Sequence, residues 1–83
     1  MENANPGQYR TSDLHFAAYL KVAGVKFLEA VREGGERVVF VFEEGEAMRD
    51  LKNAYFSRTA KVVAMNYADE IKALKALTHM AGR

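Results

Sequence analysis

The two histidines of this chain, His15 and His79, are the side chains best suited to acid–base or metal chemistry near neutral pH. Neither lies in an H-x-x-x-H or H-x-x-E pattern, which would place a second metal ligand on the same face of a helix. Asp13 precedes His15 by two residues, and positions two apart do not face each other on a helix. We therefore expect His15 on a helix surface and His79 at a polar chain end, with neither in a metal or catalytic site.

The serine and carboxylate side chains give no catalytic pattern either. No G-x-S-x-G sequence surrounds Ser12 or Ser57, and the chain has no cysteine. Glu43, Glu44 and Glu46 form a carboxylate cluster, but they lack the alternating spacing of the oxygen ligands in a calcium loop. Their charge instead suits the start of a helix, where the backbone is partly positive. The sequence predicts a protein that is not an enzyme and that binds no metal and no cofactor.

The charged residues are divided unevenly between the two halves of the chain. Residues 1–48 hold five Lys or Arg and eight Asp or Glu, whereas residues 49–83 hold seven and three. Such asymmetry either indicates an anionic partner or gives two solvated faces of opposite sign that attract each other within the fold. We favour the second interpretation, because nucleic-acid-binding domains usually carry a stronger basic excess.

Nucleic-acid binding through the basic half is the alternative hypothesis. Basic side chains bind phosphates, and exposed aromatic rings stack on bases. The residues that could do this are Arg49, Lys52, Arg58 and Lys61, with Tyr55 and Phe56 between them. We favour a core role for both aromatic residues, with Tyr55 on the apolar stripe of a helix and Phe56 closing the core below it.

Length and composition indicate one small globular domain. The chain has 83 residues, of which 49% are hydrophobic, and this content is enough for a modest core. No apolar run has the length of a membrane span, and no signal-peptide pattern follows the first residues. We expect a cytoplasmic protein with a disordered tail at residues 1–7 and a single domain at residues 8–80.

The stretch Val25–Glu44 predicts a β-hairpin around which the other elements pack. Gly34 and Gly35 favour a two-residue turn, because both positions of such a turn need a positive φ. The resulting register places Phe27, Val31, Val38, Phe40 and Phe42 on one face of the hairpin and Leu28, Ala30, Val39 and Val41 on the other. The first face is the better candidate for the core beneath the helices.

Three helices and two short extended segments are predicted around this hairpin. The predicted helices span residues 13–22, 46–56 and 63–80. N-cap residue types at 11–13 begin the first helix, and Gly24 ends it. Residues 9–11 are an extended candidate, and residues 59–62 are either an edge strand, which we favour, or the first turn of the last helix. The predicted class is α+β in the order β-α-β-β-α-β-α, with a central antiparallel hairpin packed by three helices.

The second face of the hairpin needs a cover, because Leu28, Ala30, Val39 and Val41 are all apolar. The C-terminal helix or a second copy of the chain could provide it. An apolar patch that a small monomer leaves open usually marks an interface, and two-fold dimers are the commonest oligomers. We therefore predict a homodimer with these four residues in its interface.

Four short motifs resemble a family of small domains. They are Tyr9-Arg10-Thr11-Ser12-Asp13-Leu14, Ala17-Ala18-Tyr19-Leu20, Val38-Val39-Phe40-Val41-Phe42-Glu43 and Leu74-Lys75-Ala76-Leu77. Their pattern is similar to that of a bacterial and phage domain known only as a domain of unknown function. The resemblance covers residues 9–78 and implies the element order given above, but no activity, cofactor or catalytic residue. We expect a non-enzymatic interaction or adaptor module that self-associates, without a membrane role and with an unidentified protein partner.

Overall fold

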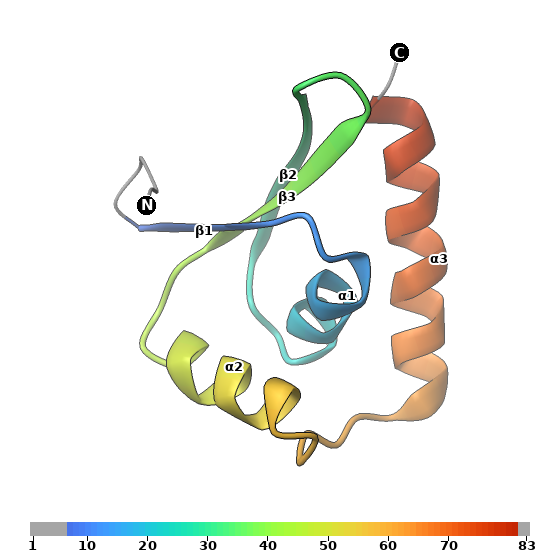
Figure 1. Ribbon diagram of the computed structural model, residues 1–83. Helices are drawn as coiled ribbons and strands as arrows, with labels where there is room; N and C mark the ends of the chain where they lie inside the picture. Colours follow the sequence, from blue (N-terminus) through green and yellow to red (C-terminus); the bar gives the residue numbers. More distant parts are fainter. Residues whose placement is uncertain (1–6, 82–83) are drawn as a thin grey trace.

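The computed structural model describes residues 7–81 and confirms the predicted α+β class (Figure 1). Its elements in chain order are β1 (Gln8–Thr11), α1 (Leu14–Val22), β2 (Phe27–Glu33), β3 (Arg37–Glu43), α2 (Met48–Phe56) and α3 (Ala64–Ala81). Residues 1–6, which belong to the predicted tail, and residues 82–83 lie outside the described part of the chain.

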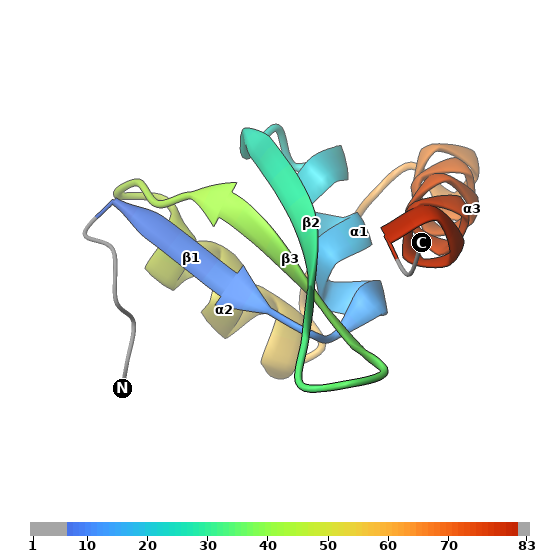
Figure 2. The same ribbon diagram turned by 90° about the horizontal axis from the view of Figure 1, so that it is seen from above.

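Strand β3 is the centre of a three-stranded antiparallel sheet, with β1 and β2 at its edges. The extended segment predicted near residues 9–11 is therefore a sheet strand, in which Tyr9 pairs with Phe42. Viewed from above, α2 lies behind β1 and β3, and α1 lies between β2 and α3 (Figure 2). The core forms between the helices and the sheet face that carries Phe40 and Phe42.

Helix α1 lies in the middle of this core. Its N-terminus is capped by Asp13, whose Oδ1 accepts a hydrogen bond from the backbone N–H of Phe16 at 3.0 Å. Residues 16–20 are all buried, because the sheet, α2 and α3 surround the helix. Gly24 follows the helix with a φ of 94° and ends it as predicted.

The turn of the hairpin is one residue longer than predicted. Gly34 and Gly35 both have the expected positive φ. Glu36 also belongs to the loop, so that the first pair of the ladder is Glu33 with Arg37. The predicted two-residue turn is therefore wrong, and the register of most of the hairpin shifts by one residue.

This shift exchanges the faces of Ala30 and Val31. Ala30 pairs with Phe40 and packs against the core, whereas Val31 pairs with Val39 on the opposite face. The prediction that placed Val31 on the core face and Ala30 on the outer face was wrong. Successive strand residues point to opposite sides of a sheet, so a shift of one residue turns each side chain over.

An irregularity near the start of β2 brings the first pair of the hairpin back to the predicted register. Leu28 is an extra residue between the pairs formed by Phe27 and Glu29. Phe27 therefore pairs with Phe42 as predicted, and their rings meet edge to face with centroids 5.3 Å apart. The two phenylalanines close the core at this end of the sheet.

Residues 59–62 are neither a strand nor part of a helix. The backbone N–H groups of Thr59 and Ala60 both donate to the carbonyl of Ala54, at 2.9 and 3.1 Å. These donors close the end of α2, so they are not free to form a sheet ladder. The favoured edge strand is therefore absent, and α3 begins at Ala64.

Helix α3 is attached to α1 by two polar contacts. The hydroxyl of Tyr67 donates to the backbone carbonyl of His15 at 3.2 Å. Lys21 Nζ and Glu70 Oε1 form an ion pair at 2.9 Å. Leu74, one turn further along α3 than Glu70, is fully buried. The last helix is therefore fixed on α1, on the same side of the sheet as the core.

Candidate interaction surface

The titratable and nucleophilic side chains are dispersed in the structure. Among residues 7–81 there is no group of three or more His, Cys, Asp or Glu side chains that could hold a metal. His15 and His79 are exposed on α1 and α3. The Ser57 hydroxyl donates to a backbone carbonyl of α2 at 3.3 Å. These side chains thus lie apart from one another in the described part of the chain.

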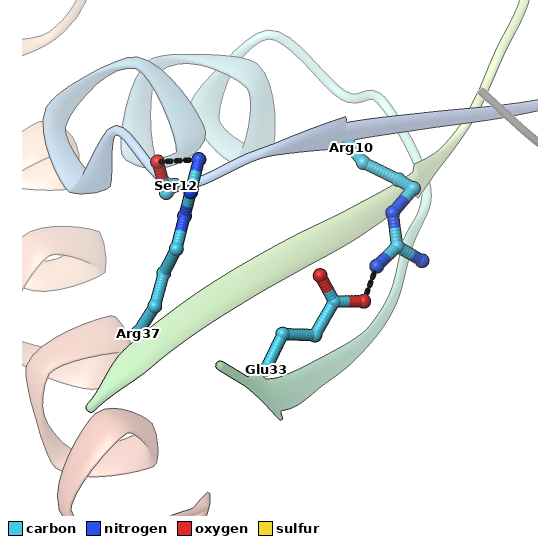
Figure 3. Close-up of polar contacts among 4 residues, drawn as sticks. All are labelled: Arg10, Ser12, Glu33 and Arg37. Atoms are coloured by element: carbon cyan, nitrogen blue, oxygen red, sulfur yellow. Dashed lines mark hydrogen bonds and ion pairs between the residues drawn. The ribbon is translucent and has the colours of Figure 1, made fainter. Parts of the chain in front are cut away.

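The sheet face opposite the helices carries long polar side chains from both edge strands. Arg10 on β1 forms an ion pair with Glu33 on β2, and the two side chains meet across the central strand (Figure 3). Arg37 Nη2 donates to Ser12 Oγ at 3.5 Å and links β3 to the segment after β1 (Figure 3). Val41, the cross-strand partner of Arg10, is fully buried. Polar side chains thus shield the apolar centre of this face.

The four residues predicted for a dimer interface do not form one exposed patch. Ala30 faces the core. Val39 and Val41 are only 5% and 0% exposed within the single chain. Leu28 is exposed at 39% and is the only one of the four with a large accessible area. The cover over Val41 comes from its own sheet, in which Arg10 of β1 is its cross-strand partner and reaches Glu33 of β2.

The four basic residues of the nucleic-acid hypothesis lie in two groups, one between the N-terminal turn and the middle of α2 and one past its C-terminal end. Arg49 and Lys52 line a hollow of about 300 Å³ together with Glu44, whose carboxylate offsets their charge. Arg58 and Lys61 are exposed beyond the other end of the helix. These four side chains therefore do not make one continuous basic face.

The two aromatic residues between them have different environments. The rings of Tyr55 and Phe16 are 4.9 Å apart between centroids, and Tyr55 packs against the core as predicted. Phe56 also contacts Phe16, at 5.3 Å, but its side chain is 63% exposed. Phe56 covers the core on one side only, so its other side is available for a partner.

Four large exposed apolar side chains lie within the segment that runs from the end of α2 to the first turn of α3. Val62, Val63 and Met65 are 37%, 63% and 76% exposed, and they follow Phe56 closely in the chain. Two exposed cations lie among them. We call this group the link surface, and its residues are Phe56, Arg58, Lys61, Val62, Val63 and Met65. The sequence signal for it is the absence of Asp and Glu over residues 51–68.

A hollow of about 200 Å³ adjoins the link surface. Its lining residues are Tyr19, Tyr55, Arg58, Ala60, Val62 and Tyr67. Burial raises the pKa of Tyr55 to about 12, and the negative charge of Asp13 and a hydrogen bond with Tyr67 add to this effect. The Tyr55 hydroxyl therefore remains protonated at neutral pH.

Arg58 has a backbone conformation that favours glycine. Its φ is 67°, and it is the only non-glycine residue with a positive φ among residues 7–81. The backbone N–H of Arg58 donates to the carbonyl of Tyr55 at 3.2 Å, and the backbone N–H of Thr59 donates to the carbonyl of Ala54 at 2.9 Å. This pair of hydrogen bonds is the Schellman motif at the C-terminus of a helix. A side chain at this position costs about 1 kcal/mol or more relative to glycine. Strain of this kind occurs often at functional sites.

The chain is a small α+β domain in which three helices pack on one face of a three-stranded sheet. Residues 6–80 match the family model of a domain of unknown function (DUF5659), so the chain belongs to this family. No match was found among curated proteins or among solved structures. Within the described residues, every helix is too short or too polar to cross a membrane.

Proposed function

We propose that this domain is a non-enzymatic interaction module that self-associates as a homodimer. The two copies contact each other through the link surface. The observation that supports this function is the concentration of Phe56, Val63 and Met65, each more than 60% exposed, within ten residues of chain. Exposed apolar groups gathered in one place usually mark a site of protein contact. The module would act by joining chains rather than by transforming a substrate.

The link surface is a better contact surface than the open face of the sheet. The sheet face has already buried Val39 and Val41 and carries an internal ion pair between Arg10 and Glu33. Covering the sheet face with a partner would desolvate these charges for little apolar gain. Covering the link surface would remove large apolar side chains from water and would leave only two cations to be paired.

The test is the solution mass of the protein by light scattering, over a range of concentrations. We expect a dimer in wild type and a shift to monomer in the double variant Val63→Ser/Met65→Ser. The matched control is Met80→Ser, because Met80 is 68% exposed near the other end of α3 and outside the link surface. A wild-type protein that remains monomeric at the highest concentration would refute self-association.

Nucleic-acid binding is the second candidate function, and one observation favours it. Phe56 is exposed beside Arg58 and Lys61, with no carboxylate in residues 51–68 to repel phosphate. Such a combination of cations and an aromatic ring can bind a single strand. This function predicts binding that weakens steeply between about 50 and 200 mM salt. It also predicts loss of binding in Arg58→Glu/Lys61→Glu but not in Phe56→Tyr, and absent binding to both DNA and RNA would exclude it.

A further inference from the structure

Helix α2 separates two segments of opposite charge. Glu43, Glu44 and Glu46 precede the helix and are all exposed. Arg58 and Lys61 follow it and are exposed as well. None of these five side chains takes part in an ion pair within the described residues. Both ends of α2 therefore present charged side chains that form no direct ion pair within the described residues.

The acidic end is hollowed as well as charged. A depression of about 460 Å³ is lined by Glu44, Gly45, Glu46, Arg49 and Asp50. Three of its lining residues are carboxylates, against one cation. A long basic side chain from a partner could enter such a depression and pair with carboxylates there.

We propose that two copies of this chain pack their α2 helices antiparallel about a two-fold axis, so that the acidic segment of each copy binds Arg58 and Lys61 of the other. The inference rests on the proposed self-association and specifies its geometry. A two-fold axis makes the same surface serve both subunits, so the surface must be complementary to itself. A surface with opposite charges at its two ends meets this requirement when two copies run in opposite directions.

The positions along the chain agree with this arrangement. Lys52 is the middle residue of α2, and an axis that crosses the helix there sets each residue opposite the one equally far away on the other side. Beyond the two ends of the helix, the segment with Glu43 and Glu46 of one copy then lies on the same side of the axis as the segment with Arg58 and Lys61 of the other. The helix between them is roughly 14 Å long, so the two charged ends are separate contacts rather than one mixed cluster.

The residue at the axis does not oppose the packing. The ammonium group of Lys52 lies over the ring of Tyr9, 5.1 Å from its centroid, and is thus turned toward β1 of its own chain. Asn53, the next residue, is exposed and uncharged. Phe56 is exposed near the end of the helix and would lose its contact with water in the dimer. The left-handed Arg58 would then have a role that glycine could not fill.

Paired charge reversals test this arrangement. Variant one is Arg58→Glu/Lys61→Glu, and variant two is Glu43→Lys/Glu46→Lys. Each variant alone sets like charges against each other, so we expect its dimer dissociation constant to rise about 100-fold or more. An equimolar mixture restores attraction at both ends, and we expect a heterodimer of wild-type affinity. Light scattering and native mass spectrometry report both results, and circular dichroism checks that each variant is folded.

The control variant reverses charges elsewhere on the surface. Lys72→Glu/Lys75→Glu changes two exposed cations of α3 and should leave the dimer intact. A dimer that survives in either variant alone, or that the mixture does not restore, would overturn the antiparallel arrangement while leaving self-association standing. A monomeric wild type would instead overturn the proposed self-association itself, so the two failures are distinguishable.

Discussion

Gly24 and Arg58 hold the same position at the ends of two helices. Each has a positive φ, 94° in Gly24 and 67° in Arg58, and each donates its N–H to a carbonyl three residues earlier. The next N–H, from Val25 or Thr59, reaches back five residues in both cases. Glycine adopts this conformation without steric cost, whereas arginine does not. The backbone conformation at the end of α2 therefore has a steric cost that the end of α1 does not have.

Arg58→Gly should stabilise the protein by about 1 kcal/mol, because it removes the cost of a left-handed side chain. Equilibrium unfolding in urea measures this change. The same variant should weaken the dimer, since it removes a cation of the link surface. Arg58→Lys keeps both the charge and the backbone cost, so it should match wild type in stability and in association. A less stable Arg58→Gly would mean that the side chain supports the fold.

Gly24→Ala is the converse substitution and should destabilise the protein by about 1–2 kcal/mol. No atom lies within 4 Å of the position that a Cβ would take at Gly24. The loss would therefore come from the backbone conformation alone and should leave self-association unchanged once the protein is folded.

Phe40→Ala should destabilise the protein by about 3–5 kcal/mol, because the side chain is 1% exposed and its removal leaves a cavity between the sheet and α1. Phe56→Ala is the matched control on the link surface, and its cost should stay below about 1 kcal/mol. Urea unfolding of both variants gives the comparison. Equal losses would contradict the assigned core.

The register of the hairpin predicts opposite responses at two adjacent positions. Ala30→Lys places a charge against Phe40 on the core face and should cost about 2 kcal/mol or more. Val31→Lys places it on the open face beside Glu29 and Glu33 and should cost less than about 1 kcal/mol. Thermal unfolding ranks the two variants, and the reverse order would indicate the two-residue turn.

The stability should fall as the pH rises above 10, in part through Tyr55. Its folded pKa of about 12 exceeds the ordinary value of 10.0, so the folded state retains a proton that the unfolded state loses. The contribution of Tyr55 is thus fully present below pH 10 and is lost between pH 10 and about pH 12. Urea unfolding at several alkaline pH values should show a shallower decline in Tyr55→Phe than in wild type. Identical slopes would contradict the raised pKa.

The Arg10–Glu33 ion pair should contribute little to stability. Both side chains keep substantial exposure, 30% for Arg10 and 50% for Glu33, so solvent screens their attraction. A double-mutant cycle with Arg10→Ala and Glu33→Ala should give a coupling of about 0.2–1 kcal/mol that decreases with salt. A coupling above about 2 kcal/mol would show that the pair has a larger role in joining the two edge strands.

Local signals in the sequence were sufficient to predict the elements of this fold. The cap at Asp13, the glycine after α1 and the spacing of apolar residues in α2 depend on neighbours in the chain. In each case the residue and the backbone groups that it caps or constrains lie within one or two helical turns of each other. Such patterns need no knowledge of the rest of the fold.

Three features of this fold depend on contacts between separate segments of the chain. One additional loop residue, Glu36, settled which of Ala30 and Val31 faces the helices, because a register depends on pairing between two strands. The closing of α2 by Thr59 and Ala60 removed the strand favoured at residues 59–62. The burial of Val39 and Val41 and the exposure of Phe56 and Met65 are also collective properties. Local sequence patterns thus locate the three helices and three strands that form, whereas the absence of a strand at residues 59–62 and the set of apolar residues that stay accessible to a partner follow only from how those elements pack.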